Sequence, residues 1–369
     1  MRSHKNATLE LGGRPGGRLS FLLACLLLPA AVRAQDPALP AFSVSSGTAL
    51  LSSPASTTAP VAQGGNFSIP LPDGRTLWLL NNVWTGRKRP DGQPEVWGII
   101  DGAAALAPST SPYSQAGRLA FVSDENGWPL PLLSGDLKEY SQARKFWPSS
   151  GFCSGGRCCA FYSIMNNFGP DPYDYFRVGQ GVACSERPAG PYVKAPFGDG
   201  YAFWNDIEPA FGSAAFFDED GWLYVYGREE TSPGEYPAQL ARVRPDKLAS
   251  RADYSYYSAD AGSVPWTSDV SEASDVIPDM PEEFSVSYNQ ALGAYLAVYS
   301  DRGTGSLTAR LAPYPWGPWS GPSRLLACAK EDYCYGGREQ PGFAAAGGKK
   351  IFVTLEKKHV PYLYEIDFD

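Results

Sequence analysis

The chain has 369 residues, of which 31 are Lys or Arg and 39 are Asp or Glu, so its formal net charge is −8. This balance argues against a nucleic-acid partner, because affinity for phosphates comes largely from clustered Lys and Arg. The sequence holds only two histidines, which argues against a Ser-His-Asp triad or a centre built from several histidines.

Residues 1–34 have the pattern of a secretory signal peptide. Two arginines precede a short apolar run from Leu19 to Ala30, and Val32-Arg33-Ala34 has the small-residue pattern of a cleavage site. The run is shorter than the roughly 20 residues that a membrane-spanning helix needs. We therefore expect a secreted, extracellular chain that begins near Gln35 and has no membrane anchor. Cleavage would leave 26 basic and 38 acidic residues, a net charge of −12.

Residues 35–60 are rich in Ser, Thr, Ala and Pro, and this composition predicts a leader or linker ahead of the folded domain. The rest of the chain, residues 61–369, is long enough for one domain with a large core. Near its start, Asn66-Phe67-Ser68 is an acceptor sequon for N-glycosylation.

A repeated glycine turn predicts the fold. Five times a glycine is followed by a run of β-branched or aromatic residues that ends in a polar pair, at Gly74, Gly156, Gly221, Gly293 and Gly348. The spacings of 82, 65, 72 and 55 residues average about 68, enough for a four-stranded sheet and a loop in each repeat. Five such units in a ring make an all-β, five-bladed β-propeller. The alternative is a two-sheet sandwich, which need not repeat at this period.

A second motif recurs at close to twice the average spacing of the glycines. Its two copies are Pro188-Ala189-Gly190-Pro191-Tyr192 and Pro315-Trp316-Gly317-Pro318-Trp319. This independent repeat favours the same ring of units.

Six cysteines follow residue 34, an even number that indicates three disulfides in an exported chain. They are Cys153, Cys158, Cys159, Cys184, Cys328 and Cys334. The last two are isolated from the others and should pair. Because Cys158 and Cys159 are neighbours on a predicted strand, where side chains alternate faces, they should take different partners from Cys153 and Cys184. A zinc site is the competing interpretation, but the sequence after residue 34 has a single histidine.

The predicted topology alone, without any sequence motif, indicates where a ligand site should lie. In each blade the segment before the turn glycine should be the innermost strand, and the segment after it the second strand. The start of the first and the end of the second then meet at one mouth of the central channel. The residues near the starts are Asn66, Glu208, Glu283, Glu339 and Gln340, and those near the ends are Asn82, Asn167, Arg228, Asp301 and Glu356. Loops that converge in this way commonly form ligand pockets.

Carboxylates are the remaining candidates for catalysis. Glycoside hydrolysis uses two of them, one protonated and one ionised, about 5 to 10 Å apart. Our candidates are Glu208 and Glu283, with Asp206, Asp301 and Glu339 behind them. Trp84 and Trp204 could stack on sugar rings or pack blade against blade. His359, in the Lys-flanked segment EKKHVP, reads as a surface-turn histidine.

Several segments resemble those of a known family, namely LPDGRTLWLLNNVWTG, FGSAAFFDEDGWLYVYGR, EEFSVSYNQALGAYLAVYSD and GPWSGPSRLL. They are similar to a secreted domain family, long catalogued as being of unknown function, that includes bacterial endo-D-arabinanases. The resemblance covers nearly all of the chain after the N-terminal segment. It implies a five-bladed propeller and inverting attack on arabinofuranosyl linkages.

The same resemblance implies two aspartates in the first blade, one near the start of the inner strand and one at the return. Here the matching positions are Asn66 and Asn82, and an amide is neither a useful acid nor a useful base. Either the acidity has moved to Glu208 and Glu283, or the fold has been kept for binding.

Three classes of function therefore remain open. The first is a carbohydrate-active propeller, glycoside hydrolase-like, that acts on an extracellular polysaccharide with arabinan-type linkages. The second is a non-catalytic propeller that binds a glycan or another small ligand; a propeller recruited to other chemistry is a third class. We expect a monomer with no cofactor, although carboxylates in the channel could hold calcium.

Overall fold

The computed structural model describes residues 38–50, 60–89, 94–136, 139, 144–170 and 174–369. The chain from Pro37 to Asp369 forms one compact unit. The expected signal peptide lies outside the described residues. Among the helices of the described chain, none is long and apolar enough to cross a membrane.

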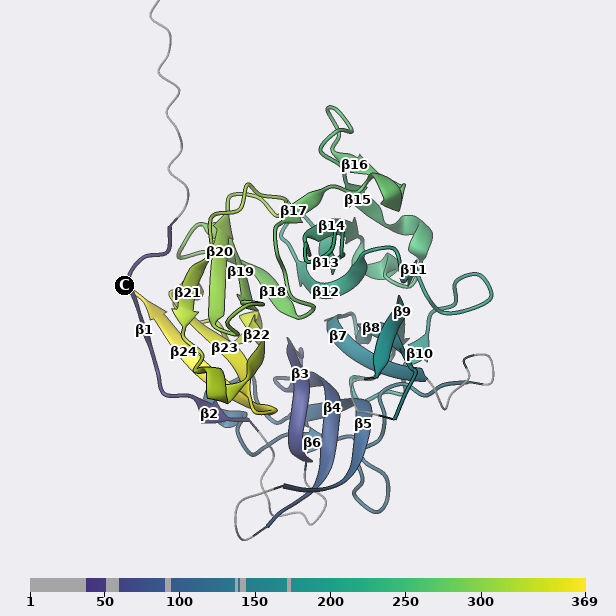
Figure 1. Ribbon diagram of the computed structural model, residues 1–369, viewed down its shortest axis with the longest axis vertical. Coiled ribbons are helices and arrows are strands. Elements are labelled where there is room, and N and C mark those ends of the chain that lie inside the picture. The colour runs from purple at the N-terminus through teal and green to yellow at the C-terminus, as the bar shows by residue number, and fades with distance from the viewer. Residues whose placement is uncertain (1–37, 51–59, 90–93, 137–138, 140–143, 171–173) are drawn as a thin grey trace, which may run out of the picture. The chain divides into compact units, whose positions relative to one another are not determined.

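Five antiparallel sheets form a ring (Figure 1). The first sheet contains β3 (Pro60–Pro70), β4 (Thr76–Lys88), β5 (Pro94–Ala107) and β6 (Ala120–Phe121). The second contains β7 (Arg144–Ser154), β8 (Arg157–Asn167), β9 (Tyr175–Ser185), β10 (Val193–Lys194) and β11 (Trp204–Asn205). The third contains β12 (Ala210–Phe217), β13 (Leu223–Arg228), β14 (Ala238–Val243), β15 (Ser255–Tyr257), β16 (Trp266–Thr267) and β17 (Asp275–Ile277).

The fourth sheet contains β18 (Phe284–Asn289), β19 (Ala294–Ser300), β20 (Leu307–Ala312) and β21 (Ser323–Leu326). The fifth contains β22 (Cys334–Glu339), β23 (Lys350–Lys357), β24 (Val360–Phe368), β1 (Phe42–Val44) and β2 (Thr48–Ala49). Short 3-10 helices lie in the loops, at Pro112–Ser114, Pro245–Lys247, Arg251–Asp253, Val270–Glu272, Lys330–Asp332, Pro341–Phe343 and Ala346–Gly348.

The five turn glycines lie where the repeat places them. Each precedes the second strand of a sheet, at the β3–β4, β7–β8, β12–β13, β18–β19 and β22–β23 connections. Their φ angles run from +60° to +90°, a region in which glycine carries no steric penalty. The prediction of a five-bladed propeller is confirmed, and the sandwich alternative is excluded. The Gly-Pro repeat also recurs in equivalent places, before the outer strands β10 and β21.

The start of the described chain closes the ring. β1 pairs with β24 with Phe42 opposite Phe368, and β2 pairs with the same strand. The N-terminal segment 35–60, predicted as a leader or linker, therefore supplies strands to the fifth blade. The composition of the segment conceals this role, because Phe42-Ser43-Val44 is only a three-residue strand. Joining the two ends of the chain in one sheet protects the edges that an open ring would expose.

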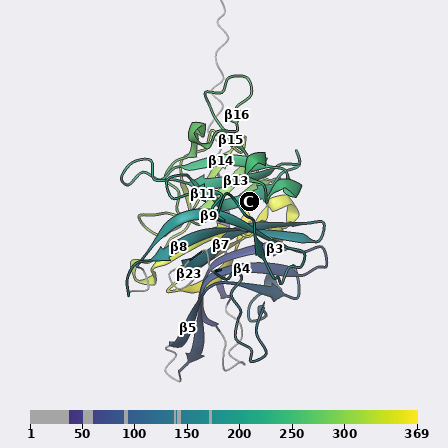
Figure 2. The ribbon, with the colours of Figure 1, turned by 90° about the vertical axis from the view of Figure 1, so that its right-hand side faces the viewer.

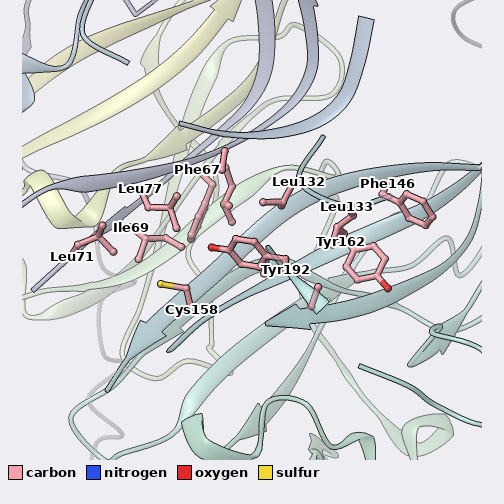
Figure 3. Packing of buried hydrophobic residues seen from close by; sticks show 14 of the residues in the cluster. Phe67, Ile69, Leu71, Leu77, Leu132, Leu133, Phe146, Cys158, Tyr162 and Tyr192 are labelled. Atoms are coloured by element: carbon pink, nitrogen blue, oxygen red, sulfur yellow. The ribbon is translucent and has the colours of Figure 1, made fainter. Parts of the chain in front are cut away.

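The blades pack face to face through apolar side chains. Figure 3 shows one such layer, in which Phe67, Ile69 and Leu77 of the first blade meet Phe146 and Tyr162 of the second. Comparable clusters join the other neighbouring blades. Burial of large apolar side chains, worth about 1.5–3 kcal/mol each, holds the ring together. The first blade differs in having an arm, because the far end of β5 projects away from the ring (Figure 2).

The three disulfides follow the predicted pairing. Cys153 pairs with Cys158, and Cys159 pairs with Cys184. These two bonds join β8 to its neighbours on either side, β7 and β9. The third links Cys328 to Cys334. The zinc interpretation is wrong for these thiols, since all six form disulfides.

Candidate functional site

Most innermost strands are irregular near the channel. Register shifts interrupt four of the five: β3 within Pro60–Phe67, β7 at Pro148–Ser150, β12 at Phe211–Ala214 and β22 at Tyr335–Arg338. Bulges of this kind bend a strand and redirect its side chains, and they are frequent beside active sites. Here they determine which side chains reach the centre of the ring.

A pocket of about 460 Å³ opens over this region. Every blade contributes to its lining, for example through Asn81, Trp147, Ser213, Asp301 and Gly336. Residues far apart in sequence therefore meet at one opening, which is the arrangement that allows a propeller to assemble a site.

Glu283 lies in this pocket, just before β18. Its Oε1 accepts a hydrogen bond from Nδ2 of Asn81 at 2.9 Å. The same oxygen lies 3.6 Å from Nη2 of Arg338, whose side chain is fully buried. The Glu283 side chain is 19% exposed. Glu283 therefore has a charged partner, Arg338, on its buried side and is open to the pocket on the other.

Glu356, on β23, is fully buried next to this group. Its Oε1 accepts a hydrogen bond from Nδ2 of Asn66 at 2.8 Å. Tyr335 is its cross-strand neighbour on β22. Burial, reinforced by the negative charge of Glu283, raises the pKa of Glu356 to about 8. Glu356 therefore holds a proton at neutral pH.

Gly336 brings the two carboxyl groups together. A Cβ atom at this glycine would lie 2.8 Å from Oε1 of Glu356 and 3.1 Å from Oε2 of Glu283. Both distances are measured from the same Cβ position, so the separation of the two oxygens cannot exceed their sum. Any other residue would be strained here, since φ is +61° and its Cβ would force the two carboxyl groups to move.

Two asparagines on the first blade have left-handed backbones. Asn66 has a φ of 49° and Asn82 a φ of 42°, values that asparagine tolerates better than most residues. Strained backbone of this kind concentrates at functional sites. The resemblance implies carboxylates at these positions, but here the Asn66 amide bonds Glu356 and Asn82 lines the pocket.

The sequon at Asn66 cannot carry a glycan in the folded chain. The Asn66 side chain is fully buried, and its Nδ2 donates to Glu356 while its Oδ1 accepts from Gln63. The predicted glycosylation of Asn66 is therefore corrected, because the nitrogen that would bear the sugar is enclosed and already bonded.

The structure places Glu208 differently from Glu283. The Glu208 carboxylate accepts from Nη2 of Arg251 at 3.0 Å and from the Asn205 backbone at 2.8 Å. It is not among the described residues that line the pocket. Neighbouring Asp206 contributes its backbone carbonyl to Arg177. The predicted pair of Glu208 and Glu283 is thus not brought together at one opening.

The two tryptophans proposed to stack on sugars have other partners. Trp204 is fully buried, and its Nε1 donates to the Tyr256 hydroxyl at 2.9 Å. The prediction of sugar stacking is wrong for Trp204, because no face of its ring is open. Trp84 stacks on His359 with ring centres 5.2 Å apart. His359 is half-buried rather than a simple surface-turn histidine, and its Nδ1 lies 2.8 Å from the Tyr335 hydroxyl.

The other candidate residues divide between the pocket and its surroundings. Arg228 lines the pocket and pairs with Glu282 at 3.1 Å. Asp301 also lines it, but its carboxylate accepts from the backbone of its own loop. Asn167 lies exposed at the end of β8. Glu339 is buried between blades, where it accepts from Ser287 and where burial raises its pKa to about 7.

Glu356 should make stability depend on pH. Its pKa in the folded chain, about 8, exceeds the ordinary value of 4.5, so between these values the folded state binds a proton that the unfolded state has released. The free energy of unfolding should therefore fall as pH rises through this window, by up to about 1.4 kcal/mol per pH unit. Urea denaturation from pH 5 to 9 should show a smaller fall for Glu356→Gln than for the unsubstituted protein. Identical slopes would contradict the assignment.

Solved structures of glycoside hydrolases share this fold. A provisionally assigned hydrolase from Bacteroides ovatus superposes with a TM-score of 0.62 at 15% identity, covering 85% of this chain and 87% of that one. A GH43_1 enzyme from Xanthomonas citri gives 0.50 at 15% identity, with 87% and 91% covered. A family 117 glycoside hydrolase from Zobellia galactanivorans gives 0.50 at 12% identity, with 90% and 92% covered. The protein is therefore a propeller of the fold that these solved structures share.

A known family matches part of the sequence. Residues 182–364 match the family described as "Domain of unknown function (DUF4185)". This match agrees with the resemblance carried by the strand and turn motifs. No curated protein matches the chain.

Proposed function

We propose that this protein is a secreted, carbohydrate-active propeller that binds an arabinan-type polysaccharide in its pocket and hydrolyses furanosyl linkages there. One observation carries the proposal: two carboxyl groups from different blades, Glu283 and Glu356, meet at Gly336 and have different surroundings. Two neighbouring carboxyl groups in different environments are typical of the pairs that hydrolyse glycosidic bonds.

The two groups divide the work that hydrolysis requires. Glu283 reaches into the pocket and would contact the scissile linkage, where its carboxylate can act as base or nucleophile. Glu356 is buried next to Glu283 and itself holds a proton. Glu283 is therefore the catalytic residue in this proposal, and Glu356 is a positioning residue that supplies the proton reserve.

Secretion rests on two further features. The N-terminal sequence has a signal-peptide pattern, and three disulfides cross-link the folded chain. Disulfides persist in oxidising compartments and are rare in the cytosol. An extracellular polysaccharide is the substrate class that such a location offers.

A second candidate is a propeller that binds a glycan without cleaving it. Among the described residues that line the pocket, Glu282 is paired with Arg228 and Asp301 is bonded to its own loop. Glu356 is shut off below Gly336. Glu283 is then the one carboxylate of the described lining whose partners, Asn81 and Arg338, leave it open to the pocket. A single carboxylate suits binding better than cleavage, because hydrolysis uses two.

Incubation with linear arabinan, branched arabinan and arabinogalactan separates the two candidates. The proposal expects new reducing ends from at least one substrate, and calorimetry should show binding of the same substrate. Binding without release would support the second candidate. Neither binding nor release from any of the three polymers would contradict both.

A further inference from the structure

A line of three titratable side chains leads from the buried carboxyl to the turn between β23 and β24. Glu356 and Tyr335 are cross-strand partners on β23 and β22. The Tyr335 hydroxyl lies 2.8 Å from Nδ1 of His359. Oε2 of Glu356 is buried without a hydrogen-bond partner, so the line begins at a fully buried group with an unpaired oxygen and ends at a half-buried one.

The His359 ring is held in place at the end of this line. Trp84 stacks on it, with an angle of 20° between the ring planes. The backbone carbonyl of His359 accepts a hydrogen bond from the backbone N–H of Gln63 at 3.2 Å. Lys358 and His359 both have positive φ angles, 50° and 64°, which residues other than glycine adopt only where the surroundings enforce them. A ring fixed this firmly suits a directed hydrogen bond.

A tyrosine hydroxyl has one proton to donate, so the line has two possible directions. When Glu356 is ionised, Tyr335 donates to its carboxylate and accepts from a protonated Nδ1 of His359. When Glu356 is protonated, it donates to Tyr335, which in turn donates to an unprotonated Nδ1. The protonation of Glu356 and the tautomer of His359 are therefore coupled.

We propose that Tyr335 and His359 conduct protons between solvent and the buried carboxyl of Glu356. In the inward step Nε2 of His359 takes a proton from water, Nδ1 passes its proton to the Tyr335 oxygen, and Tyr335 passes its own proton to Glu356. All three groups end neutral, and one proton has moved from solvent to the carboxyl. The outward step is the reverse, and it leaves Glu356 ionised.

The surrounding charges are compatible with this role. Glu283 faces Glu356 from the segment before β18 and Arg338 faces it from β22, and these two act on its pKa in opposite directions. On the other side, Tyr333 and Tyr335 contact the His359 ring. Burial lowers the pKa of His359, which keeps the imidazole neutral and able to change tautomer at neutral pH. The inference concerns proton movement alone and does not require that the pocket cleave its ligand.

Nitrogen-15 NMR of the histidine rings tests this path directly. The chain has two histidines, His4 and His359, and comparison with His359→Gln assigns their signals. Between about pH 7 and 9 we expect the protonated nitrogen of His359 to change from Nε2 to Nδ1, as Glu356 loses its proton. In Glu356→Gln the change should disappear, because the amide does not titrate.

Tyr335→Phe separates proton conduction from a merely structural effect. Phe keeps the ring but removes the hydroxyl, so the tautomer of His359 should no longer follow Glu356, while circular dichroism should show an intact fold. A tautomer that stays constant from pH 6 to 10 in the unsubstituted protein would overturn the proposal. An unchanged switch in Glu356→Gln or in Tyr335→Phe would overturn it as well.

Discussion

Replacing Glu283 by Gln should lower the rate of arabinan cleavage by about 10³-fold, within the range typical for the loss of a group that transfers protons. The amide keeps the shape of the side chain, and its oxygen can still accept from Asn81, as Oε1 of Glu283 does at 2.9 Å. Affinity for the substrate should therefore change little. Initial rates with a soluble arabinan, together with calorimetric binding constants, measure the two effects separately.

Glu208→Gln is the matched control for this substitution. Glu208 is a carboxylate of the same size near the start of an inner strand, but its partners are Arg251 and the Asn205 backbone. We expect its cleavage rate to remain within about threefold of the unsubstituted protein, as for a change outside the reacting centre. Loss of cleavage in Glu208→Gln with full activity in Glu283→Gln would contradict our assignment of the site.

Trp204→Ala should destabilise the protein by about 3–5 kcal/mol, the usual cost of truncating a buried aromatic residue. The Trp204 ring is fully buried and packs against Phe211 and Tyr254, with ring centres 5.2 and 5.0 Å away. The substitution also removes one of the two donors to the Tyr256 hydroxyl and leaves Nη1 of Arg251 as the other. Urea denaturation followed by tryptophan fluorescence measures the loss.

Trp97→Ala provides the comparison, because Trp97 lies on the projecting end of β5 and is 45% exposed. Its free energy of unfolding should change by less than about 1 kcal/mol, since little buried surface is lost. If Trp204→Ala instead kept its stability and lost only ligand affinity, Trp204 would have to face the pocket, contrary to the structure.

The fold was predictable because its repeat is marked by glycines, which strongly favour one backbone conformation at the turns. The five turn glycines need positive φ, and no other residue type marks that conformation so clearly. The alternation of side chains along β8 likewise predicts different disulfide partners for Cys158 and Cys159. The closing strand β1 was hidden, since three residues that pair only with the far end of the chain leave no local pattern.

The site was less predictable because it depends on irregular backbone. Glu208 and Glu283 are both near the starts of inner strands, yet only the second lines the pocket. The sequence places Glu356 at a strand end, but no local pattern marks it as a partner of Glu283. The signal that could have found it is the pair Gly336-Gly337 inside β22, since glycine within a strand often marks a bulge or a close approach.

The central claim is that one pocket gathers a ligand over Glu283 and the buried Glu356. A crystal structure of the Glu283→Gln protein with an arabino-oligosaccharide tests it most directly. We predict the sugar in the pocket lined by Asn81, Asp301 and Gly336, with the anomeric carbon of one residue facing the side chain at position 283. An oligosaccharide bound only elsewhere, for example on the exposed Trp97 and Trp128 of the first blade, would contradict the claim.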